Sequence, residues 1–445
     1  MSAARGGGDV PAAAPAARRA PALVVFALLG LIGLLTITPK AWSWNDASRM
    51  ATVQSIVERG TLAIDGTDFY TMDKVQVGGH FYSDKPATPQ LFGALVYAPL
   101  KALGIELRPG WNLAYYLITL LTVKLLWWLS LIAFHRALRY TGLVGSRRLW
   151  LTAALGVGTL ALTWSATFNS HSWAASWMTI GFLFFLRARR GTHTARDIFV
   201  AGLAFGLAGG ADVATLALPA AFGCYQLFDR RLRRSLWAYA LALVVALSPW
   251  LVSNVAISGS VVPVQLVSEY FLFPGSPWTL DTLTGAQLNT GQQLATYSLG
   301  LLVGGRGFLL YNPLTVVAIP LMVAEVVRRR PFAVEALAAA TASVVMFAYY
   351  ALWSNNFSGA SYSIRWFVPL LPLWLFFLHP LLQGKGWWRM AVFLVLFAIS
   401  VPIAWVGTWN PWPWQRYGPV PFLVNLRMGA GWAESLWKAV RAAFP

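Results

Sequence analysis

Long apolar runs, broken by short polar turns, make up most of this chain. An apolar run of roughly 17–25 residues can cross a lipid bilayer as a helix. The pattern predicts eleven spans, at residues 22–39, 113–133, 149–168, 172–187, 197–210, 212–228, 236–257, 312–327, 332–353, 366–383 and 388–407. We therefore predict an all-α polytopic membrane protein.

One further stretch, residues 88–104, is also apolar enough to be a span. We interpret it as a helix at the outer membrane interface, because it contains Pro89, Pro99 and Lys101. Counting it as a span would also invert every later helix and place the arginine clusters outside, against the positive-inside rule. Residues 40–112 then form the first outer loop.

This loop opens with a predicted amphipathic helix. The helix starts near Asn45 or Asp46 and ends at Gly60, since glycine commonly terminates helices. Its apolar face carries Met50, Val53 and Val57. The first outer loop is therefore expected to hold juxtamembrane helices.

Composition and charge agree with a membrane protein. Hydrophobic residues make up 57% of the chain and charged residues 11%, which excludes a single water-soluble core. The net charge of +18 comes largely from bursts of arginine between apolar runs, as in cytoplasmic loops, so we expect no nucleic-acid binding. We predict a multi-pass protein of the inner (plasma) membrane. Its parts are a disordered cytoplasmic tail (1–21), a transmembrane domain (22–407) and an outer, membrane-hugging tail (408–445).

The first outer loop contains the first candidates for chemistry. Asp46 lies just past the first span, where partial desolvation suits a general base; a helix N-cap is an equally good interpretation. Lys85 lies where the loop returns to the membrane, at a depth suited to a phosphate. The alternatives for Lys85 are a snorkelling lysine or a surface pair with Asp84, which is itself expected to be a local partner.

Later candidates lie at the outer ends of other spans. Asn169 and His171 occupy a tight turn, where a histidine could bind substrate or transfer a proton, and Asp212 is expected to cap a helix. Arg306 and Arg365 lie beside Gly- and Ser-rich turns, where a guanidinium can bind phosphate through two hydrogen bonds. Pairing with headgroups or with an outer carboxylate is the alternative for both arginines.

Known cofactor and metal signatures are missing from the sequence. It contains 5 histidines with no pair at metal-binding spacing, and no P-loop, GxSxG, HExxH or CxxC motif. We expect neither a metal nor another cofactor, and a nucleotide-driven pump or a serine hydrolase is unsupported.

Several short motifs resemble those of the GT-C superfamily of glycosyltransferases that use polyprenyl-phosphate sugars. The closest resemblance is to protein O-mannosyltransferases and lipid A aminoarabinose transferases. The motifs are Asp46-x-x-Arg49, Lys85-Pro86, Gly305 to Pro313 and Ser361 to Pro369. They cover only about forty residues, while the resemblance in topology covers the whole chain.

The resemblance implies that the first-loop Asp is the base and that the following Lys faces the donor phosphate, roles that fall on Asp46 and Lys85. Many relatives have a second acid where this chain has Ala47, and an Asp in the turn that here holds Asn169 and His171; His171 could replace it. We assign the donor phosphate also to Arg365 and Arg306. Possible substrate contacts are Arg49, Asp84, Asn169, His171 and Tyr362.

Leaving-group chemistry fits these residues, since a polyprenyl phosphate departs as an anion and needs cations, not a general acid. We predict sugar transfer, with inversion, from a polyprenyl-phosphate donor to a glycan, lipid or protein hydroxyl at the outer face. The rival is a transporter or flippase for a lipid-linked or small substrate. Transporters usually have ionisable residues near mid-membrane, and here only Lys124 and the short 197–228 hairpin hint at that.

Overall fold

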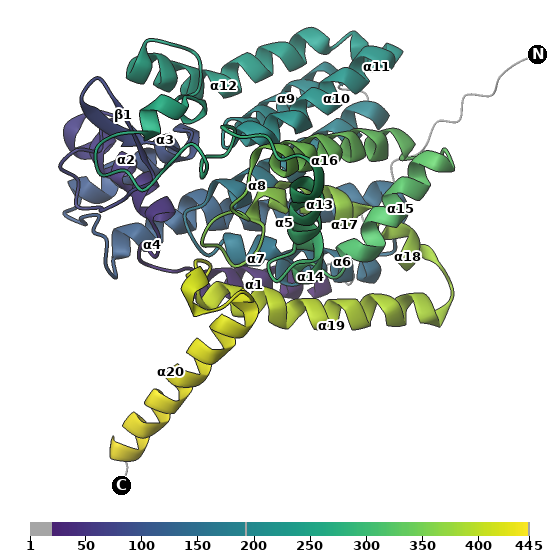
Figure 1. The fold of residues 1–445 in the computed structure, drawn as a ribbon. Helices are drawn as coiled ribbons and strands as arrows, with labels where there is room; N and C mark the ends of the chain where they lie inside the picture. Colours follow the sequence, from purple (N-terminus) through teal and green to yellow (C-terminus); the bar gives the residue numbers. More distant parts are fainter. Residues whose placement is uncertain (1–19, 192–193, 444–445) are drawn as a thin grey trace, which may run out of the picture.

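The computed structural model describes residues 20–191 and 194–443, so the predicted tail at 1–21 lies almost entirely outside the described residues. Long helices run side by side in one bundle, and the elements of the first outer loop gather at one end of it (Figure 1). One short β-hairpin is the only sheet within the described ranges. The predicted all-α class is confirmed.

The apolar runs of the sequence became the helices of the bundle. Among the residues that the structure describes, five helices are long and apolar enough to cross a membrane, and a pair bent by 97° between Gly291–Tyr311 and Thr315–Val327 would make a sixth. The total of eleven spans therefore stays a prediction. The helices are α1 (Ala20–Leu35), α4 (Leu113–Thr119), α5 (Leu125–Ala137), α6 (Gly145–Val157), α7 (Leu160–Trp164), α8 (Ser170–Arg190), α9 (Thr194–Gly209), α10 (Ala217–Phe228), α12 (Leu236–Ser258), α13 (Gly291–Val303), α14 (Phe308–Tyr311), α15 (Thr315–Val327), α16 (Ala333–Trp353), α17 (Leu371–Phe376), α18 (His379–Gln383) and α19 (Trp387–Trp409).

Small residues let the central helices approach closely. A Cβ atom added at Gly181 of α8 would lie 2.3 Å from the Phe205 ring of α9. One added at Gly206 of α9 would lie 2.5 Å from Ala246 of α12. Such close approach is how membrane helices gain packing energy without a hydrophobic driving force. It fixes the ends of α8 and α9, from which side chains of the candidate site project.

The first outer loop folds as two helices and a hairpin. Helix α2 (Trp44–Arg59) begins at Trp44, one residue before the predicted start, and ends at Gly60, whose φ of 67° suits glycine. Strands β1 (Lys74–Val77) and β2 (His80–Ser83) pair antiparallel across two glycines, a turn signal that the helical prediction overlooked. Helix α3 (Thr88–Ala102) follows and packs against α2.

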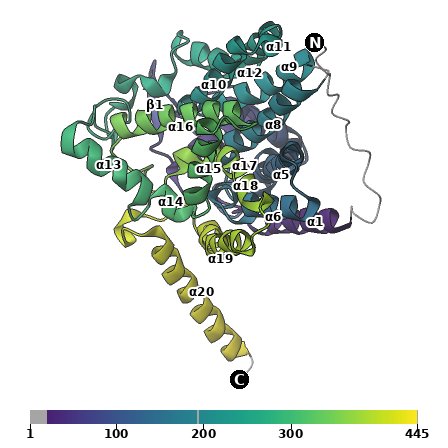
Figure 2. The same cartoon turned by 90° about the vertical axis from the view of Figure 1, so that its right-hand side faces the viewer.

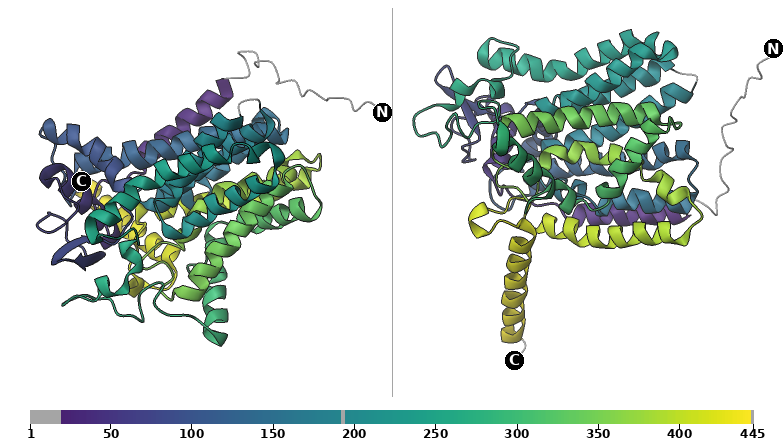
Figure 3. Two further views of the ribbon diagram at one scale, coloured as in Figure 1. Left: turned by 90° about the horizontal axis from the view of Figure 1, so that it is seen from above. Right: turned by 45° about the vertical axis from the view of Figure 1, so that its right-hand side comes forward.

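Two features distinguish the two ends of the bundle. The arginine-rich helix α11 (Arg230–Arg233) and the α15–α16 turn lie at the end opposite α2, the end that Figure 2 faces. Helix α20 (Pro421–Ala443) leaves the bundle where α19 ends, on the side of α2, and points away from the bundle at a steep angle to α19 (Figure 3). The membrane-hugging tail at 408–445 stays a prediction.

Candidate active site

A cavity of about 700 Å³ opens at the end of the bundle that carries α2 and the hairpin. Among the described residues, three cationic and three carboxylate side chains line it. Aromatic rings form much of the remaining wall. The charged residues are Arg49, Lys85, Arg365, Asp73, Asp84 and Asp212, and the tryptophans are Trp44, Trp278, Trp353, Trp366, Trp412 and Trp414.

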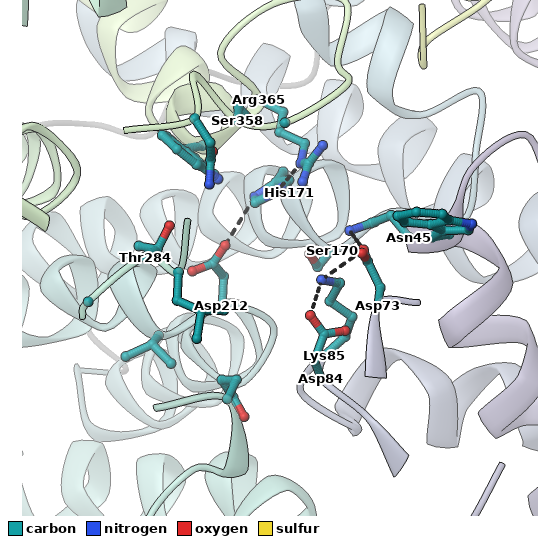
Figure 4. Close-up of a pocket in the computed structure, with 18 of the residues that line it drawn as sticks. Asn45, Asp73, Asp84, Lys85, Ser170, His171, Asp212, Thr284, Ser358 and Arg365 are labelled. Carbon is teal, nitrogen blue, oxygen red and sulfur yellow. Dashed lines mark hydrogen bonds and ion pairs between the residues drawn. The ribbon is translucent and has the colours of Figure 1, made fainter. Parts of the chain in front are cut away.

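Lys85 lies between two carboxylates (Figure 4). Its Nζ atom is 2.5 Å from Asp84 Oδ2 and 3.1 Å from Asp73 Oδ2. The turn after β2 holds it in place, because the Lys85 backbone N–H donates to Ser83 Oγ at 3.2 Å. Asn45 Nδ2, from the first turn of α2, donates to Asp73 Oδ2 at 3.3 Å. The hairpin and helix α2 thus meet at the ion pair between Lys85 and Asp73.

The two carboxylates differ in their readiness to take a proton. Burial acts to raise the pKa of Asp73, but Lys85, Arg365 and the Asn45 hydrogen bond together outweigh it, so this pKa lies below its ordinary value. Burial dominates at Asp84 and, with the charge of Asp73, raises its pKa in spite of Lys85. Asp84 Oδ1 is buried and accepts no hydrogen bond from any residue that the structure describes. Asp84 therefore offers an unused, basic oxygen.

Arg49 joins α2 to the start of α8. Its Nη1 atom donates to Asn45 O at 3.0 Å, and its Nη2 atom donates to Ser170 Oγ at 2.8 Å. The side chain is buried, yet it borders the cavity. A buried guanidinium held from two sides is a fixed positive charge facing the cavity.

Arg365, His171 and Asp212 form a chain across the opposite wall. Arg365 Nε donates to His171 Nε2 at 3.2 Å, and His171 Nδ1 lies 3.2 Å from Asp212 Oδ2. Because arginine can only donate, Nε2 must accept, and the imidazole is neutral with its proton on Nδ1. His171 therefore orients Arg365 and has no basic nitrogen left for a substrate proton.

The two ends of this chain differ. Asp212 Oδ1 accepts hydrogen bonds from Tyr350 OH at 3.2 Å and from the Ala214 backbone N–H at 3.1 Å, which confirms its predicted cap role. At the other end, no described residue accepts a hydrogen bond from the two terminal nitrogens of Arg365, which lies 4.7 Å over the Trp412 ring. A guanidinium with both Nη groups available suits a phosphate.

Asp46, the predicted base, is not among the residues that line the cavity. It is fully buried, and its Oδ2 atom accepts the Trp42 backbone N–H at 3.3 Å. The N-cap is Ser43, whose Oγ accepts the Asp46 N–H at 3.2 Å, so Asp46 reinforces the cap from the first turn. Burial raises the pKa of Asp46 to about 7, against the Trp42 N–H and the charge of Arg49.

This buried carboxyl predicts a pH-dependent stability. A folded-state pKa of about 7, against the ordinary 3.8, means that Asp46 contributes stability at low pH that is lost as the pH rises through 7. Asp46→Asn removes the titration and keeps the shape. Between pH 5 and pH 8 the wild type should lose about 2–3 kcal/mol relative to Asp46→Asn. Thermal unfolding across this range checks it; parallel pH profiles would contradict it.

The structure separates the remaining predicted residues. Lys85, Arg365, Arg49, Asp84 and His171 line the cavity. Three others do not line it: the Asn169 side chain caps α8, Tyr362 OH donates to Ile403 O at 2.8 Å within the core, and the Arg306 guanidinium donates to Gly359 O.

Sequence reasoning missed Asp73, Asn45 and Ser170, which line the cavity. Asp73 is one of many acids in the first outer loop, and no spacing distinguishes it. Only the hairpin, which returns Lys85 to Asp73, reveals the pair.

Comparison with known proteins identifies the fold. No protein-family model matches the sequence, and no curated protein matches it. Among solved structures, the apo oligosaccharyltransferase of Archaeoglobus fulgidus is similar with a TM-score of 0.54 and 12% identity, over 89% of this chain and 57% of that chain. ArnT from Cupriavidus metallidurans bound to undecaprenyl phosphate is similar with a TM-score of 0.52 and 15% identity, over 92% and 75%.

A third similar structure is the archaeal oligosaccharyltransferase AglB from A. fulgidus, in complex with an inhibitory peptide and a dolichol-phosphate. Its TM-score is 0.52 at 12% identity, over 88% of this chain and 56% of that chain. The chain therefore spans a little over half the length of the archaeal proteins. At these identities the likeness concerns the fold, and at that level the predicted resemblance to GT-C glycosyltransferases is confirmed.

Proposed function

We propose that this protein is a membrane glycosyltransferase that moves a sugar from a polyprenyl-phosphate donor to an acceptor hydroxyl. The observation that carries the proposal is that Lys85, Arg49 and Arg365 line one cavity together with carboxylate side chains. Support comes from the fold, since similar structures were solved with undecaprenyl phosphate and with dolichol-phosphate.

The donor phosphate is assigned to Lys85 and Arg365. Arg365 presents its terminal nitrogens, and His171 fixes the direction of the guanidinium. Lys85 already faces Asp73 and Asp84, so an arriving phosphate competes for its ammonium. A phosphate that pairs with the Lys85 ammonium weakens the ion pair between Lys85 and Asp84, so the pKa of Asp84 rises further. Donor binding thus strengthens the base.

Asp84 is proposed as that base. Its free Oδ1 accepts the proton of the acceptor hydroxyl, and the resulting oxygen attacks the anomeric carbon opposite the phosphate. The carbon–oxygen bond to the phosphate breaks with its electron pair on the phosphate, which leaves as an anion held by Lys85 and Arg365. In-line displacement of this kind inverts the anomeric carbon. The earlier candidate, Asp46, remains the alternative base and would require the start of α2 to open.

The orientation proposed for the protein follows from charge. The arginine-rich helix α11 and the α15–α16 turn lie at the end opposite the cavity (Figures 1 and 2). The positive-inside rule places such an end in the cytoplasm. The cavity then faces the outer side of the plasma membrane, with the N-terminus inside.

The rival, a transporter, loses one of its two supports. Lys124, buried in a π-helical turn (Leu120–Lys124), donates to Thr36 Oγ1 at 3.1 Å and Ser165 Oγ at 2.7 Å. These bonds join three segments of the bundle, and Lys124 does not line the cavity. A structural anchor therefore explains the lysine without a transport path.

Mass spectrometry of envelope lipids and glycans in a deletion strain tests the proposal. We expect a polyprenyl-phosphate sugar to accumulate and one glycosylated envelope component to disappear, with both effects reversed by the intact gene. An unchanged profile of lipids and glycans would contradict the proposed activity.

A further inference from the structure

The outer loop between α16 and the 3₁₀ helix η7 (Arg365–Leu370) has an unusual backbone. Phe357, Ser358 and Gly359 are consecutive and have φ angles of 48°, 69° and 68°. Only glycine adopts this left-handed region without steric cost. A run that includes a phenylalanine and a serine persists only where neighbouring structure enforces it, and such runs cluster at functional sites.

Neighbouring groups do enforce this conformation. The Phe357 backbone N–H donates to Tyr297 OH at 3.2 Å, and the Arg306 guanidinium donates to Gly359 O. Ser363 Oγ in turn donates to Arg306 O at 2.8 Å. Arg306 is therefore a positioning residue, which holds the strained loop against the segment that follows α13.

This enforced loop places unpartnered polar atoms at the cavity. Ser358 is 1% exposed, lines the cavity, and its hydroxyl has no hydrogen-bond partner among the described residues. Asn356 also lines the cavity, and its buried Oδ1 atom likewise has no hydrogen-bond partner among the described residues. A buried hydroxyl without a partner is costly, and a ligand hydroxyl would satisfy it.

The surroundings indicate what kind of ligand fits. Residues 354–361 carry no charged side chain. Trp353 lines the same cavity and is 38% exposed, so its ring offers an apolar face. Asp212 also lines the cavity. Its carboxylate already accepts hydrogen bonds from Tyr350 OH and the Ala214 N–H, and it faces His171. Among the described residues, the loop itself and Trp353 offer no carboxylate to pair with an ammonium group, and Asp212 is already engaged.

We propose that the loop 356–360 is the subsite for the sugar of the donor and that it takes a neutral, hydroxyl-bearing ring. The inference rests on the proposed function. Arg365, which is assigned to the phosphate, lies seven residues after Ser358, at the end of the same loop. Because the donor sugar is bonded directly to that phosphate, the sugar must lie close to Arg365. Ser358 and Asn356 bind ring hydroxyls, and Trp353 packs against the C–H face of the ring (Figure 4 shows Ser358 in the cavity wall).

Binding measurements on the purified full chain test this subsite. The three probes are polyprenyl phosphate, polyprenyl phosphate carrying a neutral hexose, and polyprenyl phosphate carrying an amino sugar. The variants are Ser358→Ala and Ser358→Gly, with Ser248→Ala as a matched control, because Ser248 is half-buried on α12, does not line the cavity, and donates its hydroxyl hydrogen to Val245 O. We expect both Ser358 variants to bind the hexose-bearing lipid about 3- to 10-fold more weakly, the range for one hydrogen bond. Affinity for the bare lipid should stay unchanged.

Ser358→Gly adds an independent signature. Glycine relieves the left-handed strain at this position, so the Tm should rise while the affinity for the hexose-bearing lipid falls. A purely structural role for Ser358 would predict no change in affinity.

Four results would overturn the inference. Equal affinity of the wild type for both lipids, or full affinity of Ser358→Ala for the hexose-bearing lipid, would remove the sugar subsite and leave the proposed donor standing. Failure of the wild type to bind either lipid would overturn the proposed function and this inference together. Tighter binding of a lipid that carries an amino sugar would overturn the neutral specificity.

Discussion

Asp84→Asn should abolish most sugar transfer while leaving the protein folded and able to bind donor. The substitution keeps the size of the side chain and a hydrogen-bonding oxygen near Lys85, but it removes the carboxylate that lines the cavity and whose Oδ1 has no partner among the described residues. Loss of a general base lowers turnover by ~10²–10⁴-fold. Because burial raises the pKa of Asp84, wild-type transfer should increase with pH through a value above the ordinary 3.8. Steady-state rates across pH check both expectations.

Two controls make this result specific. Asp65→Asn changes an acid of the same outer loop that does not line the cavity, and its transfer rate should match the wild type. Asp46→Asn should also retain activity if Asp84 is the base. Near-normal transfer by Asp84→Asn, together with loss in Asp46→Asn, would return the base role to Asp46.

Arg365→Lys should weaken donor binding by about 10- to 100-fold, although the charge is kept. In arginine, Nε donates to His171 while the two Nη atoms face the phosphate. Lysine has a single nitrogen and cannot do both, so the bidentate geometry is lost. The affinity for polyprenyl phosphate, followed by titration of the purified variants, measures this directly.

Arg108→Lys is the matched control for this variant. Arg108 lies in the same outer loop, where it is exposed and paired with Glu106 and Asp68. Its donor affinity should not change, because surface ion pairs contribute little. Wild-type affinity in Arg365→Lys would remove Arg365 from the donor site.

The sequence predicted the bundle well because membrane helices leave long apolar runs. Each predicted run is largely helical in the structure, although the runs at 149–168 and 366–383 are divided into shorter helices, and α2 begins within one residue of Asn45. The hairpin was overlooked because its strands have only four residues each and sit in a polar loop. Its Gly78-Gly79 turn, with φ of 59° and 87°, was the available signal.

The site was only partly predictable, because it forms between segments far apart in the chain. Single residues stood out by position: Lys85 by its predicted depth near a phosphate, and Arg365 as an arginine on the predicted outer side. Their partners Asp73 and His171 are fixed by tertiary contacts that no spacing reveals. Asp46 was favoured by motif resemblance, yet the first turn of α2 directs its carboxylate back to Trp42.

Cleavage of the donor is the reaction to measure. Purified protein in lipid nanodiscs would receive polyprenyl-phosphate hexose and envelope extract from the deletion strain, and mass spectrometry would follow both lipids. If the protein is a glycosyltransferase, free polyprenyl phosphate and a hexosylated acceptor appear in equal amounts with the wild type and are nearly absent with Asp84→Asn. If the donor stays intact with the wild type, while reconstituted vesicles move it between leaflets, the protein is a transporter.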